Sequence, residues 1–168
     1  PSPVEPEYFW LGEAPTRVRA ARWRASGPAR GTLILFPGRS SILGLRMPFL
    51  KPVHDQGWTI YSWDWRGQGE SDRWLKNPRL IDVQNSFDEY VQDALEVLAQ
   101  AKQDGAPGPV AAMGVSLGGH VLLRTLQEGA ALDAAVLQVP LCDVKTRPWP
   151  ASVARLFARV ANRCGLGS

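Results

Sequence analysis

Residues Gly114-Val115-Ser116-Leu117-Gly118-Gly119 are the most informative stretch of this chain, because they carry the spacing G-x-S-x-G. An apolar run at 110–115 leads into them as a buried strand would, and a helical pattern follows at 117–127. In that context the spacing predicts a nucleophile elbow, a sharp strand-to-helix turn that exposes a serine near the positive amino end of the helix. Gly114 and Gly118 would let the neighbouring backbone approach closely. We therefore predict Ser116 as a catalytic nucleophile, with a glycine-rich turn lacking catalysis as the alternative.

The rest of the chain alternates between strand and helix patterns. Short apolar runs between turn signals predict four further strands, at 18–25, 32–36, 59–65 and 134–139. Helical periodicity predicts three further helices, at 47–56, 86–102 and 151–163. Strands that alternate with helices form parallel βαβ units. We expect an α/β fold with a mostly parallel sheet and helices on both faces.

Three local features refine this expectation. The Arg-rich run 18–25 alternates with one phase slip, which is typical of an exposed edge strand with a bulge. Ser86 and Glu89 have the spacing of a capping box at the start of a helix. Trp63 and Trp65 are expected to share the buried face of their strand.

Acyl transfer at a serine also needs N–H donors for the developing oxyanion. We expect the first from the backbone of Leu117, directly after the nucleophile. We expect the second from the loop after the strand 32–36, where Gly38 lets the chain turn so that the Arg39 N–H points inward. A plain turn at Pro37-Gly38 is the alternative.

Together with a third motif, these features resemble a known superfamily. The third motif is the run Asp64-Trp65-Arg66-Gly67-Gln68-Gly69-Glu70-Ser71-Asp72, with the pattern D-x-R-G-x-G-x-S-D. With the elbow and the Pro37-Gly38-Arg39 loop, it resembles the α/β-hydrolase superfamily, and within it bacterial lysophospholipases and monoacylglycerol lipases. The resemblance covers about residues 32–140, the amino-terminal portion of such a hydrolase. Pro37-Gly38 stands where the family usually has His-Gly, which alters the loop more than the chemistry of a backbone donor.

The resemblance implies a serine hydrolase that cleaves carboxylic esters of lipids through an acyl-enzyme on Ser116, with no metal and no organic cofactor. The implied partner is a small-molecule or lipid ester substrate. An esterase or peptidase of the same fold remains an alternative, as does a non-catalytic module that binds lipid or protein. The 64–72 run is interpreted as a structural brace near the nucleophile, in which Ser71 is a turn residue.

A serine hydrolase also needs a base and an acid that orients it, and in this fold the acid and then a histidine follow the serine. His120 lies one turn beyond Ser116 in the same predicted helix, and His54 lies within 47–56, so we interpret both as packed side chains. Asp143 follows the last predicted strand, where a minority of these hydrolases place the acid, and it stays a candidate. The resemblance places acid and base after a lid and further strands.

We expect the sequence to be a fragment that lacks these two partners. It begins with Pro1 in place of Met, and it ends on Gly-Leu-Gly-Ser directly after a helical pattern. On this interpretation, residues 1–140 are the amino-terminal part of a hydrolase core truncated before its last strands. Residues 141–168 would then begin a lid insertion.

The composition is that of a globular domain, with 168 residues of which 45% are hydrophobic and 21% charged. It excludes a disordered chain, a collagen and a disulfide scaffold. Cys142 and Cys164 lack the spacing of a zinc site, and no apolar stretch is long enough to span a membrane. We expect a cytoplasmic protein.

Basic residues concentrate near the end of the chain, where 144–168 holds five Lys or Arg and no Asp or Glu. Within 151–163, helical spacing puts arginines on one face and apolar residues on the other, namely Val153, Leu156, Phe157 and Val160. Two interpretations stay open: a lid helix over the pocket with its arginines in solvent, or peripheral contact with the anionic inner face of a membrane. No groove-reading motif accompanies these arginines, so nucleic acid is not an expected partner.

Overall fold

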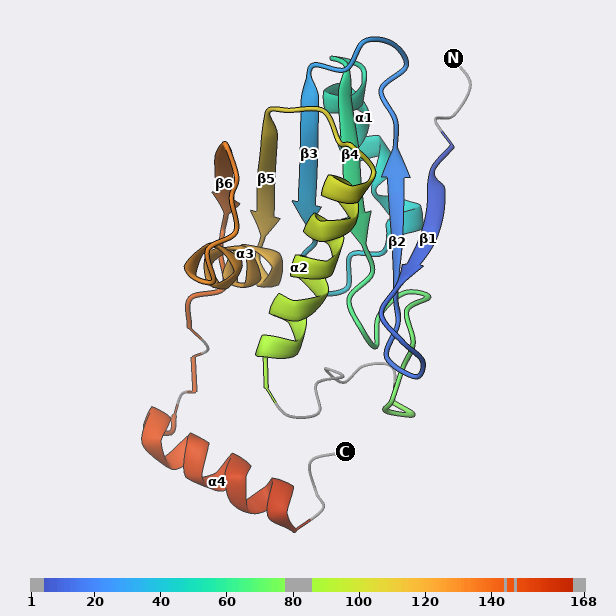
Figure 1. Ribbon diagram of the computed structural model, residues 1–168. Helices are drawn as coiled ribbons and strands as arrows, with labels where there is room; N and C mark the ends of the chain where they lie inside the picture. Colours follow the sequence, from blue (N-terminus) through green and yellow to red (C-terminus); the bar gives the residue numbers. More distant parts are fainter. Residues whose placement is uncertain (1–4, 78–85, 144, 147, 165–168) are drawn as a thin grey trace.

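The computed structural model describes residues 5–77, 86–143, 145–146 and 148–164. They form a six-stranded sheet with helices on both faces, and a further helix that lies apart from the sheet (Figure 1). The strands are β1 Glu7–Leu11, β2 Val18–Trp23, β3 Gly31–Phe36, β4 Trp58–Trp63, β5 Val110–Val115 and β6 Ala134–Gln138. The helices are α1 Met47–His54, α2 Asp88–Gln103, α3 Leu117–Gln127 and α4 Ala151–Arg163, with a short 3-10 helix at Leu43–Leu45.

The strands lie in the order β1-β2-β4-β3-β5-β6. β4, β3, β5 and β6 run parallel to one another, and β2 is antiparallel to both of its neighbours. Because parallel strands end at the same edge of a sheet, the loops that follow β3, β4 and β5 meet at one edge, called the carboxyl edge below. The predicted α/β fold with a mostly parallel sheet is confirmed.

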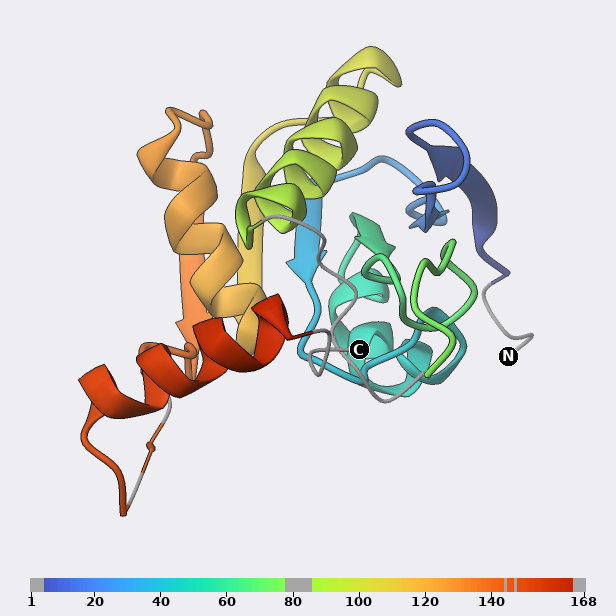
Figure 2. The same ribbon diagram turned by 90° about the horizontal axis from the view of Figure 1, so that it is seen from below.

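Two hydrophobic clusters, one on each face of the sheet, hold the layers together. α2 and α3 cover one face, and α1 covers the other (Figure 2). On the α2–α3 face, Trp63 and Trp65 are fully buried beside Phe36, as their alternation predicts. On the α1 face, Leu35 packs with Leu50. β3 contributes to both clusters, which is why its residues from Leu33 to Phe36 are all apolar.

The helix α4 has the predicted bounds and lies beyond the carboxyl edge (Figures 1 and 2). All four residues of its predicted apolar face are exposed: Val153, Leu156, Phe157 and Val160. No helix in the described ranges is long and apolar enough to cross a bilayer. The division into a core at 1–140 and a lid at 141–168 stays a prediction.

The prediction that residues 18–25 form an exposed edge strand with a bulge is wrong. β2 lies between β1 and β4 and pairs with β1 in unbroken register. The arginines that indicated an edge are satisfied by β1: Arg22 pairs with Glu7, and the Arg19 guanidinium lies 3.8 Å from the centre of the Tyr8 ring. β1, which the sequence pattern did not reveal, forms the edge instead.

The predicted capping box at the start of α2 is confirmed in its Ser86 half only. The helix begins at Asp88 with Phe87 as its N-cap, and Ser86 Oγ accepts a hydrogen bond from the Asp88 N–H at 3.0 Å. The Glu89 carboxylate accepts a hydrogen bond from Arg66 Nη1 at 2.9 Å. The Glu89 carboxylate thus pairs with an arginine distant in sequence, a charge-assisted contact that the local motif does not predict.

Arg66 joins the loop after β4 to α2 through a second carboxylate. Its Nε and Nη2 donate to Oδ2 and Oδ1 of Asp93 at 2.9 and 2.6 Å, which makes a bidentate pair. The Asp93 side chain is only 4% exposed. Burial raises the pKa of Asp93, and the hydrogen bond to Asp93 raises the pKa of Arg66. A charged side chain therefore takes part in the buried face of α2, where periodicity predicted apolar residues.

We expect Asp93→Ala to lower the free energy of unfolding by about 3 kcal/mol, because it leaves a largely buried Arg66 guanidinium without its bidentate partner. Urea denaturation measures this loss. Asp55→Ala is the matched control: Asp55 pairs with Lys51 on an exposed surface, and its removal should change the free energy of unfolding by about 0.5 kcal/mol or less. Equal losses in the two variants would contradict the role given to the buried pair.

Candidate active site

The turn between β5 and α3 holds Ser116 in an uncommon backbone conformation. Its φ is +51°, a left-handed value that a residue with a Cβ rarely adopts. The Ser116 N–H donates to the Gln138 carbonyl oxygen at 3.0 Å, and the Leu141 N–H donates to the Ser116 carbonyl oxygen at 2.9 Å. Such a conformation costs about 1–3 kcal/mol and persists only where the surroundings impose it. Strain of this kind at a strand-to-helix turn is typical of a nucleophile elbow.

Glycines let the elbow pack directly on the end of β3. A Cβ at Gly118 would lie 2.5 Å from the Phe36 carbonyl carbon and 2.6 Å from the Pro37 carbonyl oxygen. A Cβ at Gly114 would lie 2.7 Å from the Gly119 Cα atom. Any larger residue at either position would push α3 away from the sheet.

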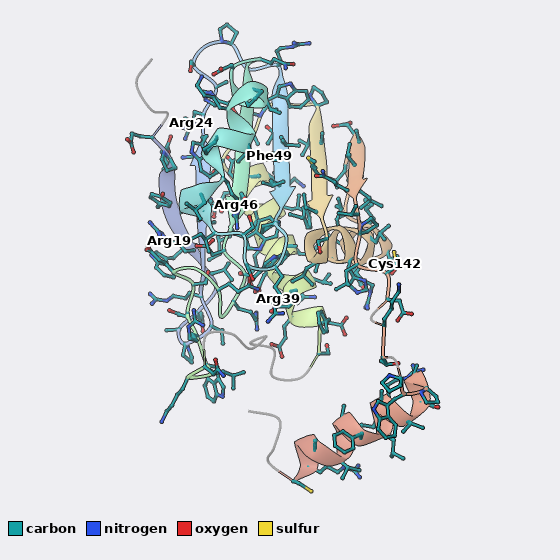
Figure 3. The ribbon with its side chains drawn as sticks, turned by 180° about the vertical axis from the view of Figure 1, so that it is seen from behind. Arg19, Arg24, Arg39, Arg46, Phe49 and Cys142 are labelled. Atoms are coloured by element: carbon teal, nitrogen blue, oxygen red, sulfur yellow. The ribbon has the colours of Figure 1, made fainter. Side chains whose placement is uncertain are left out.

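The loop after β3 lies beside Ser116 and shares a pocket with it. A Cβ at Gly38 would be 3.8 Å from Ser116 Cβ, which is an ordinary contact. The pocket has a volume of about 380 Å³ and is lined by Ser116, Gly38 and Arg39, with Leu45 and Phe49 as apolar walls. Figure 3 shows Arg39 near the carboxyl edge, at the far end of the sheet from Arg24.

The two predicted oxyanion donors belong to different elements, Leu117 to the start of α3 and Arg39 to the loop after β3. Leu117 opens α3, so its N–H belongs to the first turn, whose N–H groups have no partner within the helix. Arg39 lines the same pocket as Ser116. Within its loop, Ser40 rather than Gly38 has the positive φ, at +65°. The roles of both N–H groups stay predictions.

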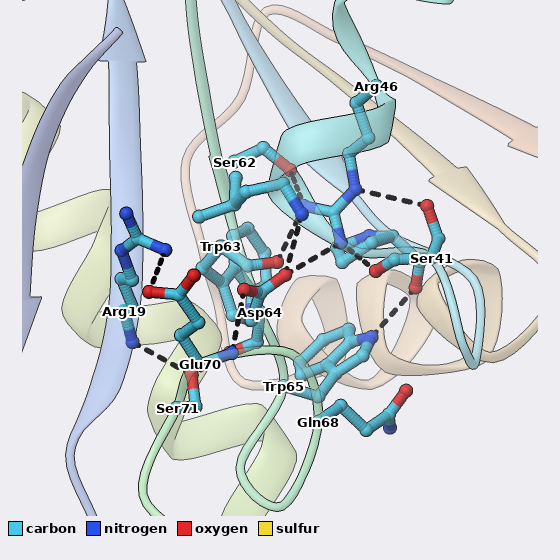
Figure 4. A network of polar contacts seen from close by, with 12 residues as sticks. Arg19, Ser41, Arg46, Ser62, Trp63, Asp64, Trp65, Gln68, Glu70 and Ser71 are labelled. Carbon is cyan, nitrogen blue, oxygen red and sulfur yellow. Dashed lines mark hydrogen bonds and ion pairs between the residues drawn. The ribbon is translucent and has the colours of Figure 1, made fainter.

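The 64–72 run braces the loop at 37–43 (Figure 4). Trp65 Nε1 donates to the Pro37 carbonyl oxygen at 2.8 Å. The Ser40 N–H donates to Gln68 Oε1 at 2.7 Å. These contacts support the structural interpretation of the run.

A buried arginine that the sequence did not reveal completes the brace. Arg46 is 4% exposed and donates to Ser41 Oγ at 3.0 Å and to the Trp63 carbonyl oxygen at 2.8 Å. Its Nη2 lies 3.4 Å from Asp64 Oδ1, which also accepts the Leu43 N–H at 2.8 Å. Burial lowers the pKa of Arg46 to about 10 and raises the pKa of Asp64. Asp64 belongs to a recognised motif, whereas no sequence signal around Arg46 marks it as buried.

The end of the same run is tied to β2. Ser71 Oγ donates to the Asp64 carbonyl oxygen at 2.6 Å and accepts the Arg19 N–H at 2.8 Å. Asp72 pairs with the Arg17 guanidinium, and that hydrogen bond lowers the pKa of Asp72. Ser71 therefore serves the turn, as its interpretation from sequence predicts.

The structure does not bring either histidine into the pocket of Ser116. His54 Nε2 lies 2.8 Å from the Arg24 carbonyl oxygen, at the end of the sheet far from Arg39 (Figure 3). The His120 ring packs edge-on against Phe87 and lines a second pocket of about 440 Å³, together with Asp143. Among the residues described, no group of three or more His, Cys, Asp or Glu side chains could hold a metal ion.

A family model described as "Serine aminopeptidase, S33" matches residues 27–167. The chain belongs to this hydrolase family. Membership in the S33 family confirms the α/β-hydrolase resemblance that the elbow and the 64–72 run indicated.

Relatives of this S33-family chain include lipid hydrolases. It is 30% identical over 152 residues to lysophospholipase L2 of Escherichia coli K12, a match that covers 90% of the chain and 43% of that protein. A monoglyceride lipase from Saccharomyces cerevisiae has a TM-score of 0.68 at 16% identity, over 95% of this chain and 53% of that one. A monoacylglycerol lipase from Paleococcus ferrophilus has a TM-score of 0.64 at 22% identity, over 87% and 51%. The chain thus spans about half the length of the relatives it matches, and the two structures show the shared fold.

We expect Gly118→Ala to lower the free energy of unfolding by about 2–3 kcal/mol, because the new Cβ meets backbone atoms of Phe36 and Pro37 that no rotamer change can move aside. Thermal or urea unfolding measures the effect. Gly27→Ala is the matched control, since a Cβ at Gly27 meets nothing within 4 Å. An unchanged stability in Gly118→Ala would show that α3 does not rest on β3 as described.

Proposed function

We propose that this chain carries the nucleophile and the oxyanion donors of a serine hydrolase that cleaves carboxylic esters of lipids, in the manner of lysophospholipases or monoacylglycerol lipases. The observation that carries the proposal is the left-handed Ser116, set between a buried strand and a helix and sharing one pocket with Arg39. The relation to a lysophospholipase and to monoacylglycerol lipases supports it.

In the proposed reaction, Ser116 Oγ attacks the ester carbonyl carbon while a base takes the hydroxyl proton. The carbonyl oxygen becomes an oxyanion, which accepts hydrogen bonds from the N–H groups of Leu117 and Arg39. Collapse of this intermediate breaks the bond to the alcohol oxygen, which leaves with the proton from the base, and an acyl-enzyme remains. A water molecule, deprotonated by the same base, then attacks the acyl carbon. The bond to Ser116 Oγ breaks, the base returns the proton to Oγ, and the fatty acid leaves.

We propose that the base and its acid come from residues outside these 168. The sequence has two histidines, His54 and His120. His54 is held at the far end of the sheet, and His120 packs on Phe87 in a different pocket. Asp143 lines the pocket of His120 and is the alternative to an acid from outside the chain.

The described walls of the Ser116 pocket favour an acyl chain over a free amino terminus. Leu45 and Phe49 line it and are both exposed, so they present apolar surface to a ligand. The described lining has no Asp or Glu, whereas an aminopeptidase needs a negative group to bind the substrate's ammonium. The part of the pocket that this chain forms therefore suits the acyl chain of a lipid ester.

We expect Ser116→Ala to lower kcat for a lysophospholipid or monoacylglycerol ester by about 10⁴-fold or more in the intact protein that contains this chain, because the acyl-enzyme can no longer form. A fluorophosphonate probe, which reacts with activated serines, should label the unchanged protein and not this variant. Ester hydrolysis and labelling by mass spectrometry are the measurements.

Ser26→Ala is the matched control, because Ser26 is exposed and lies in the bend before β3. It should keep both labelling and turnover. Labelling and turnover that persist in Ser116→Ala would contradict the assignment of Ser116 as nucleophile. If the unchanged protein showed neither labelling nor turnover, the non-catalytic alternative would be favoured.

We further propose that residues 141–168 begin a lid and that α4 contacts anionic membrane surface. The apolar face of α4 is uncovered, with Phe157 76% exposed. The segment 144–168 carries five basic residues and no acidic one, which complements anionic headgroups. α4 also lies beyond the carboxyl edge, where β5 ends (Figure 1), and Ser116 directly follows β5.

We expect Leu156→Glu to weaken binding to phosphatidylglycerol-containing vesicles by about tenfold or more, because it removes buried apolar area and adds a negative charge. Vesicle co-sedimentation measures binding. Leu123→Glu is the control, since Leu123 is an exposed leucine on α3, and it should bind as the unchanged protein does. Binding that does not depend on anionic lipid, or that Leu156→Glu leaves intact, would favour a lid without membrane contact.

A further inference from the structure

Two hydrogen bonds anchor the 37–43 loop on either side of Arg39. Before Arg39, Trp65 Nε1 donates to the Pro37 carbonyl oxygen at 2.8 Å (Figure 4). After Arg39, the Ser40 N–H donates to Gln68 Oε1 at 2.7 Å. The peptide group that carries the Arg39 N–H lies between these two anchors, and its own carbonyl oxygen, that of Gly38, accepts the Ser41 N–H at 3.2 Å. Its direction therefore depends on the two anchors together with this turn.

The second anchor holds a residue whose conformation is unfavourable by itself. Ser40 has a φ of +65°, which side chains with a Cβ rarely adopt. Such a conformation persists only where neighbouring contacts impose it. The hydrogen bond to Gln68 is such a contact, and it acts on the amide that directly follows the Arg39 carbonyl.

One end of the Gln68 side-chain amide is in an unfavourable environment. Its Nε2 is buried and has no hydrogen-bond partner in the part of the chain that the structure describes. A buried donor without a partner is unfavourable, and an apolar side chain of similar length would avoid that loss. An apolar side chain would lack the oxygen that accepts the Ser40 N–H. The geometry of the loop therefore explains this glutamine better than packing does.

We propose that Gln68 is a positioning residue that aims the Arg39 N–H at the carbonyl oxygen of an ester attacked by Ser116. This inference rests on the proposed function, because it assigns the device that sets one of the two oxyanion donors. Gln68 does not line the described pocket of Ser116 and acts through Ser40 and the peptide before it. The 64–72 run thereby contributes to transition-state stabilisation without touching substrate.

The decisive variant is Gln68→Met, which keeps the length of the side chain and removes the acceptor. Removal of a whole oxyanion donor lowers kcat by about 10²–10³-fold, so a donor that is misdirected should lower kcat by about 30-fold. KM should stay within about twofold, because the donor acts on the oxyanion and not on the bound ester. The urea midpoint should change little, since the lost bond to Ser40 is offset by loss of the unpartnered amide.

Two further variants separate positioning from packing. Gln68→Glu keeps an oxygen within reach of the Ser40 N–H and should recover most of kcat. Gln68→Asn keeps an amide but withdraws it by one methylene, so it should lose kcat as the Met variant does, and it replaces that variant if Gln68→Met fails to fold. Gln92→Met, at an exposed position on α2, is the matched control and should leave kcat and KM unchanged.

Steady-state ester hydrolysis by the intact protein is measured for each variant, with Ser116→Ala in parallel. The comparison separates failure of the positioning role from failure of the proposed function. A drop in kcat for Gln68→Met and Gln68→Asn, with recovery in Gln68→Glu, supports the proposal. Activity that requires Ser116 but is unaffected by Gln68→Met, or that falls equally in Gln68→Glu, overturns the positioning role alone. Hydrolysis that does not require Ser116 overturns the proposed function and the inference together.

Discussion

Two stretches of backbone, the first turn of α3 and the end of β3, make the contact on which the rest of this structure depends. Gly118 lies so close to the Phe36 carbonyl that no side chain fits between them. The parallel register that places Phe36 opposite Gly114 sets the level at which the two elements meet. This contact fixes the elbow and the 37–43 loop relative to each other. Because both partners are backbone atoms, no rotamer change can relieve a clash, and the geometry is more rigid than a contact between side chains would be.

Buried charges then hold the loop that this contact places. An apolar pair of similar volume could stabilise the fold as well as Arg46 and Asp64 do, because removing charges from water is unfavourable. Apolar side chains could not, however, form hydrogen bonds with the backbone at the buried end of this loop. Asp64 accepts the Leu43 N–H, and Arg46 donates to the Trp63 carbonyl oxygen and to Ser41. The two charged side chains thereby fix the loop. On the proposed function, this matters because fixed donors stabilise an oxyanion without having to reorient during the reaction.

Local patterns predicted the parts of the fold that neighbours in sequence determine. β5, α3 and α4 have the predicted bounds, because apolar periodicity and the glycines of the elbow specify where each begins and ends. β1 was missed because the strand has only five residues and no regular alternation of polar and apolar side chains. Only its pairing with β2 identifies it as a strand. Arg46 and Asp93 were missed because a charged residue predicts exposure, and their burial depends on partners elsewhere in the fold, Asp64 and Arg66. The hydrogen bond between Ser40 and Gln68 also joins residues that are distant in sequence, so no local pattern predicted it.

On the proposed function, this chain supplies the nucleophile and the oxyanion donors, and residues outside the chain supply the base. Electrostatic stabilisation needs dipoles that are already oriented, and these belong to the braced loop and to the start of α3. Proton transfer needs a base, and both histidines of the chain are engaged elsewhere, His54 at Arg24 and His120 against Phe87. α4 stands beyond the carboxyl edge with its apolar face uncovered, so a lid, a lipid surface and a base that follows the lid would all approach Ser116 from one side. The nucleophile and the oxyanion donors must therefore be held by the chain's own contacts before any of these arrives, which is the arrangement that the backbone contact and the charged brace produce.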